Sequence, residues 1–218
     1  MTHYESAIQY ENAGEYGKAL EIFQRCLTGG GHDKGDLAFH LGWCLEHDPE
    51  GDRASVLQYY DQAFASAPSL VMRVNSAFRS GWVLLQGKEE EKAAAAFQRV
   101  IALAEQENFD HDLYHQALFW SAVCLERQGR YLEAAHQYGV VQRLSADLVP
   151  ESCYRLIVCC NQVGKFESAL EACRAFPLDV PSGSDPRRFS ELSALVRKEE
   201  SLLLQCLSED QPSIGSIR

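Results

Sequence analysis

A pattern of glycine, aromatic, alanine and a second, usually aromatic residue recurs along the chain and limits the folds it can adopt. The pattern is written as GEYGKALEIF at 14–23, GRYLEAAHQY at 129–138 and GKFESALEAC at 164–173. GKEEEKAAAAF at 87–97 has one extra residue, and GDRASVLQYY at 51–60 is a looser copy. The copies end at residues 23, 60, 97, 138 and 173, which are 37, 37, 41 and 35 residues apart. A period in this range is typical of arrays of paired helices.

Each copy forms the second half of a predicted helix–turn–helix pair. In the fourth copy, Leu118, Ala122 and Leu125 follow the helical spacing before the turn, and Ala134 and Tyr138 follow it after the turn. Gly129 stands between the two helices, where a left-handed residue ends the first helix. Small residues such as Ala122 and Ala134 allow the two helices to approach closely.

This pattern resembles the tetratricopeptide repeat family over roughly residues 1–178. The five units lie at about 1–33, 34–70, 71–110, 111–149 and 150–178. The chain departs from the family where a large residue is favoured early in the first helix, because Ala38, Ala77 and Cys153 stand there. The resemblance implies an all-α fold: a right-handed α-solenoid of about five helix–turn–helix repeats.

A turn-rich connection follows the array, and a further helix follows the connection. Residues 179–207 are expected to form a linker and a C-terminal capping helix, because Phe189, Leu192, Leu195 and Leu203 recur at helical spacing. The last residues, 208–218, have little apolar surface to bury, and we expect a disordered tail there.

Composition excludes several classes of partner. The formal net charge is −11 and the pI is about 5.1, which disfavours nucleic acid and anionic membrane surfaces. No stretch is apolar for long enough to predict membrane insertion, and the N-terminal residues do not read as a signal peptide. The eight cysteines include no C-x-x-C pair and fall mostly at apolar helix positions, so we expect a cytoplasmic protein.

Apolar side chains mark a second face on the first helix of each unit. They occupy two positions that are one helical turn apart. The set comprises Tyr4, Ile8, Phe39, Trp43, Phe78, Trp82, Phe119, Val123, Tyr154 and Val158. In the tetratricopeptide repeat family, such positions project into the concave groove, so the resemblance implies a groove that binds a peptide or protein. The alternative is that these residues are ordinary core.

Polar side chains border this stripe and form a predicted groove rim. The rim comprises Glu11, Asn12, Glu46, His47, Arg79, Glu126, Arg127, Arg155 and Asn161. Apart from Arg79 and Arg155, these groups are candidates to orient the basic groups of a ligand, or they form a solvated edge with no such role. Family members that clamp a C-terminal carboxylate use a Lys/Asn/Arg set that is incomplete here, so we do not predict that ligand.

Two clusters have the spacing of metal ligands, and neither is complete. His40, Cys44 and His47 lie along one helix face, as do Glu107, His111 and His115. No fourth ligand accompanies either cluster, so we predict no metal and no cofactor. Convergent titratable groups suited to catalysis are not evident in the sequence, and we predict that the chain is not an enzyme.

Three functions remain open at the level of the sequence. The first is a scaffold or adaptor whose concave groove binds an apolar or amphipathic segment of a partner protein. The second is a chaperone that masks a hydrophobic segment of a client. The third is self-assembly, in which the N-terminal edge of the array stacks on another copy to form a homo-oligomer.

Overall fold

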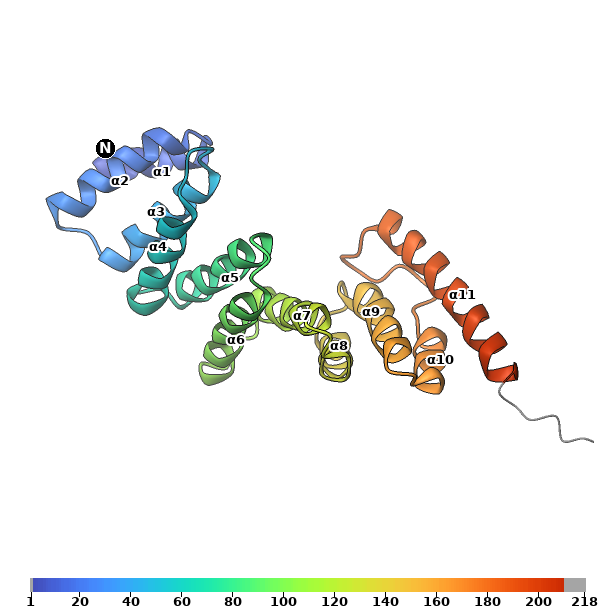
Figure 1. Cartoon of the computed structure of the whole chain (residues 1–218). Helices are drawn as coiled ribbons and strands as arrows, with labels where there is room; N and C mark the ends of the chain where they lie inside the picture. Colours follow the sequence, from blue (N-terminus) through green and yellow to red (C-terminus); the bar gives the residue numbers. More distant parts are fainter. Residues whose placement is uncertain (1, 210–218) are drawn as a thin grey trace, which may run out of the picture. The chain divides into compact units, whose positions relative to one another are not determined.

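The computed structural model describes residues 2–209 and contains eleven α-helices within that range. The first six are α1 His3–Asn12, α2 Tyr16–Gly29, α3 Lys34–His47, α4 Arg53–Ser66, α5 Leu70–Gln86 and α6 Glu90–Gln106 (Figure 1). They are followed by α7 Asp112–Arg127, α8 Tyr131–Leu144, α9 Val149–Gln162, α10 Phe166–Arg174 and α11 Pro186–Glu209. The expected all-α array of successive helix pairs is confirmed. Of the expected disordered tail, residues 210–218 lie outside the described residues, and 208–209 belong to α11.

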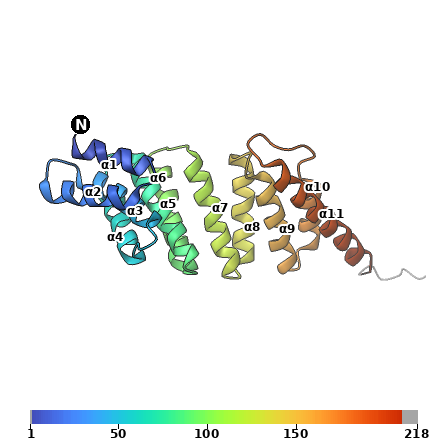
Figure 2. The ribbon, with the colours of Figure 1, turned by 90° about the horizontal axis from the view of Figure 1, so that it is seen from above.

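The chain divides into two compact units, residues 1–117 and 118–218. In the first unit, each helix from α1 to α6 packs against the next one in sequence, and α3 also contacts α5. In the second unit, α8 packs on α9, and α9 packs on α10, with α11 against both α9 and α10 (Figure 2). We call α1, α3, α5, α7 and α9 the A helices and α2, α4, α6, α8 and α10 the B helices.

Four of the five A helices end in the same way, with one residue in the left-handed region. Gly14, Gly129 and Gly164 have φ values of 75°, 75° and 72°. In the third pair Lys88 takes this place with φ of 59°, so the extra residue in that copy of the pattern shifts the turn by one position. The backbone N–H groups of these residues and of the residues that follow donate to carbonyl groups of the preceding helix.

Glycine allows the A and B helices of two pairs to make close contact. A Cβ atom added at Gly81 would lie 2.6 Å from the ring of Phe97, and one added at Gly42 would lie 2.9 Å from the ring of Tyr60. Both rings are fully buried. The recurring aromatic residue of the B helix therefore fills the space that the small residue of the A helix leaves open.

Helix α11 covers the apolar surface of the last helix pair. Leu192 and Val196 are buried against a core that includes Ile157 of α9 and Ala169 of α10. Polar contacts flank this core: Arg188 pairs with Glu151 at 3.0 Å, and Asn161 donates to Glu199 at 3.0 Å. None of the helices described between residues 2 and 209 is both long and apolar enough to cross a membrane.

Candidate functional site

The ten residues of the apolar stripe differ in how far they are exposed. Phe78 and Phe119 are each 4% exposed and Val123 is 1% exposed, so these three belong to the core. This burial differs from the expectation that the three side chains line a groove. Seven members are half-buried instead, with part of each side chain reaching solvent: Tyr4, Ile8, Phe39, Trp43, Trp82, Tyr154 and Val158.

The two buried phenylalanines pack against aromatic residues of the B helices. The ring of Phe78 packs edge-on against Phe97, with 5.5 Å between centroids. The ring of Phe119 packs against Tyr138 at 5.7 Å. Aromatic rings in such arrangements bury a large area, so these two positions stabilise the helix pairs and are not available to a ligand.

Four partly buried side chains of α3 and α5 are the candidate binding residues of this unit, and we call them the aromatic surface: Phe39, Trp43, Arg79 and Trp82. The guanidinium of Arg79 lies over the indole of Trp43 at 4.8 Å, which joins the two A helices. Phe39 precedes Trp43 by one turn, and Arg79 precedes Trp82 by one turn. His47 also packs against Trp43, with 4.3 Å between ring centroids.

The charged residues beside the aromatic surface are paired with each other. Arg79 donates to Glu46 through two nitrogens, and the contact from Nε is 2.9 Å. The hydroxyl of Tyr60, on α4, donates to the same carboxylate at 2.5 Å. Burial, and then the charge of Glu46, raise the pKa of Tyr60, so its hydroxyl stays protonated and continues to donate.

An equivalent triad occurs in the second unit. Arg155 of α9 lies 3.1 Å from the carboxylate of Glu126, and the hydroxyl of Tyr138 donates to that carboxylate at 2.7 Å. Burial and the charge of Glu126 raise the pKa of Tyr138 as well. Each triad ties one A helix to its own B helix and to the next A helix along the chain.

The first helix pair uses a histidine in the same register. Nδ1 of His40 lies 2.8 Å from the carboxylate of Glu11, and His40 is only 8% exposed. Glu11, Glu46 and Glu126 each come seven residues after the first stripe residue of their A helix. His40, Arg79 and Arg155 each come directly after the first stripe residue of the next A helix. The ion pairs therefore repeat with the helix pairs.

The third pair replaces the triad with apolar side chains. Leu85 stands where Glu46 and Glu126 stand in their helices, and Phe97 replaces the tyrosine. Both are buried. The carboxylate and the hydroxyl are lost together, which fits a structural role because either group alone would be buried without its partner.

Most of the predicted rim is thus used inside the protein. Glu11, Glu46, Arg79, Glu126 and Arg155 join successive repeats, which differs from the expectation that they orient a ligand. The ring Nδ1 of His47 lies 2.8 Å from the carbonyl of Trp43. Asn161 contacts α11, and the two remaining members, Asn12 and Arg127, are exposed.

The residues with metal-ligand spacing make other contacts. His40 pairs with Glu11, and the thiol of Cys44 lies 3.7 Å from the same carboxylate. His111 stacks on Phe109 at 4.9 Å, and His115 lies 3.0 Å from Asp110. Over residues 2–209, three or more His, Cys, Asp or Glu side chains do not gather in a group that could hold a metal ion.

Comparisons with known proteins identify the repeat. A family model described as tetratricopeptide repeat matches residues 91–146, and a second model of the same description matches residues 76–104. The chain contains tetratricopeptide repeats, which the two models place within residues 76–146. Repeats of this family generally act as protein–protein interaction modules. A comparison with the sequences of curated proteins gave no significant match.

Solved structures with the same fold share little sequence identity with this tetratricopeptide repeat chain. YrrB, described as a TPR protein with an unusual peptide-binding site, is 15% identical with a TM-score of 0.62, over 94% of this chain and 90% of that chain. A MamA structure is 11% identical with a TM-score of 0.61, over 98% and 96%. The apo form of RapI is 13% identical with a TM-score of 0.64, over 79% and 67%. At these identities the likeness establishes the fold alone.

Proposed function

We propose that the chain is a scaffold or adaptor, and that its aromatic surface binds an apolar or amphipathic segment of a partner protein. The observation that carries the proposal is the position of Trp43 and Trp82. They lie half-buried on two neighbouring A helices, with Arg79 packed over the ring of Trp43. Tryptophan and arginine are enriched among the residues that dominate binding energy at protein interfaces.

The pairing of the nearby charges favours an apolar contact at the centre of this surface. Glu46 and Arg79 neutralise each other, and their side chains are 13% and 25% exposed. A partner that covered them would gain little from opposing either charge, because the pair is already formed. The affinity would therefore come from apolar area placed against Trp43, Phe39 and Trp82.

Net charge favours basic residues at the flanks of the bound segment. Residues 1–117 contain 18 Asp and Glu and 9 Lys and Arg, so this unit carries most of the net charge of −11. An acidic surface attracts a basic partner over long range and speeds its association. YrrB, which shares the fold, is described as having a peptide-binding site, and this supports the peptide class of ligand.

The experiment starts with the full chain as bait in its native cell, followed by mapping of the segment that it captures. Binding of that synthetic segment is then measured by titration calorimetry for wild type, Trp43→Ala and Trp82→Ala. We expect each variant to weaken binding by roughly tenfold or more, because truncation of a tryptophan at such a site costs about 2 kcal/mol.

Phe64→Ala is the matched control, because Phe64 is a half-buried aromatic residue on a B helix, where Arg99 lies over its ring at 4.1 Å. Equal losses in all three variants, or unchanged binding in the tryptophan variants, would refute the proposal. A partner that becomes insoluble whenever this chain is missing would make the protein a chaperone. Light scattering of the chain alone separates partner binding from self-association.

A further inference from the structure

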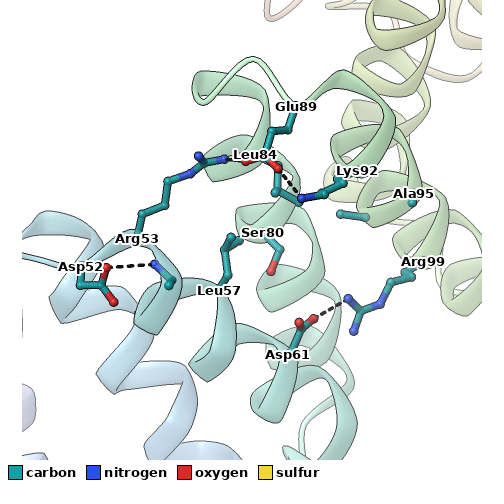
Figure 3. A pocket seen from close by; sticks show the side chains of 12 residues that line it. Asp52, Arg53, Leu57, Asp61, Ser80, Leu84, Glu89, Lys92, Ala95 and Arg99 are labelled. Carbon is teal, nitrogen blue, oxygen red and sulfur yellow. Dashed lines mark hydrogen bonds and ion pairs between the residues drawn. The ribbon is translucent and has the colours of Figure 1, made fainter.

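A cavity of about 620 Å³ lies between α4 and α6 in the first unit (Figure 3). Ala54 and Leu57 of α4 line it on one side, Ala95 and Ala96 of α6 line it on the other, and Leu84 of α5 adds to the apolar lining. The alanines leave room where two B helices face each other. The volume falls within the range of about 300–1,000 Å³ that is usual for ligand sites.

Ion pairs bound the cavity at both ends. At one end Arg53 and Lys92 both contact the carboxylate of Glu89. At the other end Arg99 contacts Asp61 at 2.6 Å. Figure 3 shows these pairs on either side of the apolar lining.

Charge in the lining is balanced. Arg53, Lys92 and Arg99 are matched by Asp52, Asp61 and Glu89. Asp52 caps the N-terminus of α4, because its carboxylate accepts hydrogen bonds from the backbone N–H and the hydroxyl of Ser55. A ligand therefore needs no net charge.

Ser80, whose buried hydroxyl has no partner in the protein, is one of the residues that line the same cavity. Ser80 of α5 is 3% exposed, and its Oγ makes no hydrogen bond within the protein. The hydroxyl of Ser76, one turn earlier, donates to the carbonyl of Met72 at 2.7 Å, so Ser80 differs from its neighbour. A buried polar atom without a partner is unfavourable, and a ligand that supplies the partner removes that penalty.

We propose that this cavity binds a short, uncharged peptide segment whose aliphatic side chains pack between α4 and α6. A peptide backbone offers both donors and acceptors, which suits the serine hydroxyl and the mixed charges of the rim. Ser80 and Leu84 lie on the opposite face of α5 from Trp82, because each is two residues from Trp82 and residues two apart are about 200° apart on a helix. The site is therefore separate from the aromatic surface.

The test uses the blocked tripeptide acetyl-Leu-Gly-Leu-amide and methyl-labelled full-length protein. We expect saturable shifts in the methyl resonances of Leu57, Leu84, Ala95 and Ala96, and no shifts with acetyl-Ser-Gly-Ser-amide. Ala95→Leu fills the cavity from an exposed position and should weaken binding by roughly tenfold. Ala102→Leu, an exposed position on α6 outside the lining, is its control and should not weaken binding.

Ser80→Ala separates binding from folding. Loss of one hydrogen bond should weaken binding of the tripeptide by about three- to tenfold. The thermal midpoint of the free variant should not fall, because the hydroxyl has no partner in the protein. Shifts that do not saturate, or that persist equally in Ala95→Leu, would overturn the proposal. Saturation by isobutanol without binding of the tripeptide would also overturn it, in favour of a small-molecule site. The double variant Trp43→Ala/Trp82→Ala should bind the tripeptide normally, so this test does not depend on the proposed function.

Discussion

The triad of Glu46, Arg79 and Tyr60 allows a prediction with a defined magnitude. In Glu46→Ala, the guanidinium of Arg79 and the buried hydroxyl of Tyr60 both lose their acceptor. Breaking a buried ion pair by removing one member costs about 3–5 kcal/mol. The side chain of Arg79 is 25% exposed and regains some hydration, so we expect a loss of about 3 kcal/mol, at the lower end of that range.

Two further variants separate the contributions to this loss. Tyr60→Phe removes only the hydroxyl, and Glu46 keeps Arg79, so the expected cost is about 1 kcal/mol. The triple variant Glu46→Leu/Tyr60→Phe/Arg79→Met imitates the third helix pair, which has Leu85 and Phe97 at two of these positions. Because it leaves no charge buried without a partner, it should remain within about 1–2 kcal/mol of wild type.

The assay is urea unfolding followed by circular dichroism, with hydrogen exchange of α3, α4 and α5 to locate the change. Glu50→Ala, at an exposed position, is the control. If Glu46→Ala lowered the free energy of unfolding by less than about 1 kcal/mol, the ion pair of Glu46 and Arg79 would not stabilise the contact between repeats. A triple variant less stable than Glu46→Ala would refute the reasoning in the same way.

Three more predictions follow from the core. Gly81→Ala should destabilise the chain by about 1–3 kcal/mol, because the new Cβ would lie 2.6 Å from the Phe97 ring. Gly17→Ala is the control and should be neutral or stabilising, because the nearest atom to its new Cβ would lie 3.8 Å away. Thermal unfolding of the two variants measures the difference. A thiol reagent should modify Cys206 quickly in the native protein and all eight cysteines in urea, because the other seven are buried; equal rates would contradict this. Burial raises the pKa of Cys44 and Cys159 from 9.0 to about 12, and burial and carboxylates raise those of Tyr60 and Tyr138 above 10.0. The unfolded chain therefore loses these protons first, so stability should be fully present below about pH 9 and fall as the pH rises toward 12, which alkaline unfolding curves would show.

The sequence predicts the helix pairs because each pair needs the same few residues in the same order. In four of the five pairs a left-handed residue ends the A helix, a small residue usually faces the partner helix, and an aromatic residue usually fills the space between them. Lys88 shows the limit of this argument. The pattern places Gly87 in the turn, but the extra residue moves the left-handed conformation to Lys88.

The sequence could not predict how far each side chain of the apolar stripe is buried. Helical spacing gives the direction of a side chain but not how much neighbouring helices cover it. Phe78 packs on Phe97 and is buried, whereas Phe39, the equivalent residue of α3, packs on Tyr60 and stays half-buried. The covering residues come from other helices, so a pattern within one helix cannot reveal them.

The paired charges of the rim could have been found from the repeat itself. Glu46 and Arg79 are 33 residues apart, and neither is informative alone. When the repeats are superposed, glutamate occurs with tyrosine in the second and fourth pairs, and leucine occurs with phenylalanine in the third; in the first pair Glu11 stands with Phe23 and has His40 as its partner instead. Such matched substitution within one chain is the signal of a buried polar contact.

The most direct measurement of the central claim is hydroxyl-radical footprinting of the three tryptophans with and without the partner segment. We propose that the segment covers the aromatic surface. Trp43 and Trp82 should therefore be oxidised more slowly in the complex, because a residue at the centre of an interface loses most of its exposed area on binding. Trp120 belongs to the other unit and serves as the internal reference. Protection of Trp43 and Trp82 with Trp120 unchanged is the predicted result. Unchanged reactivity at Trp43 and Trp82 in a saturated complex would contradict it.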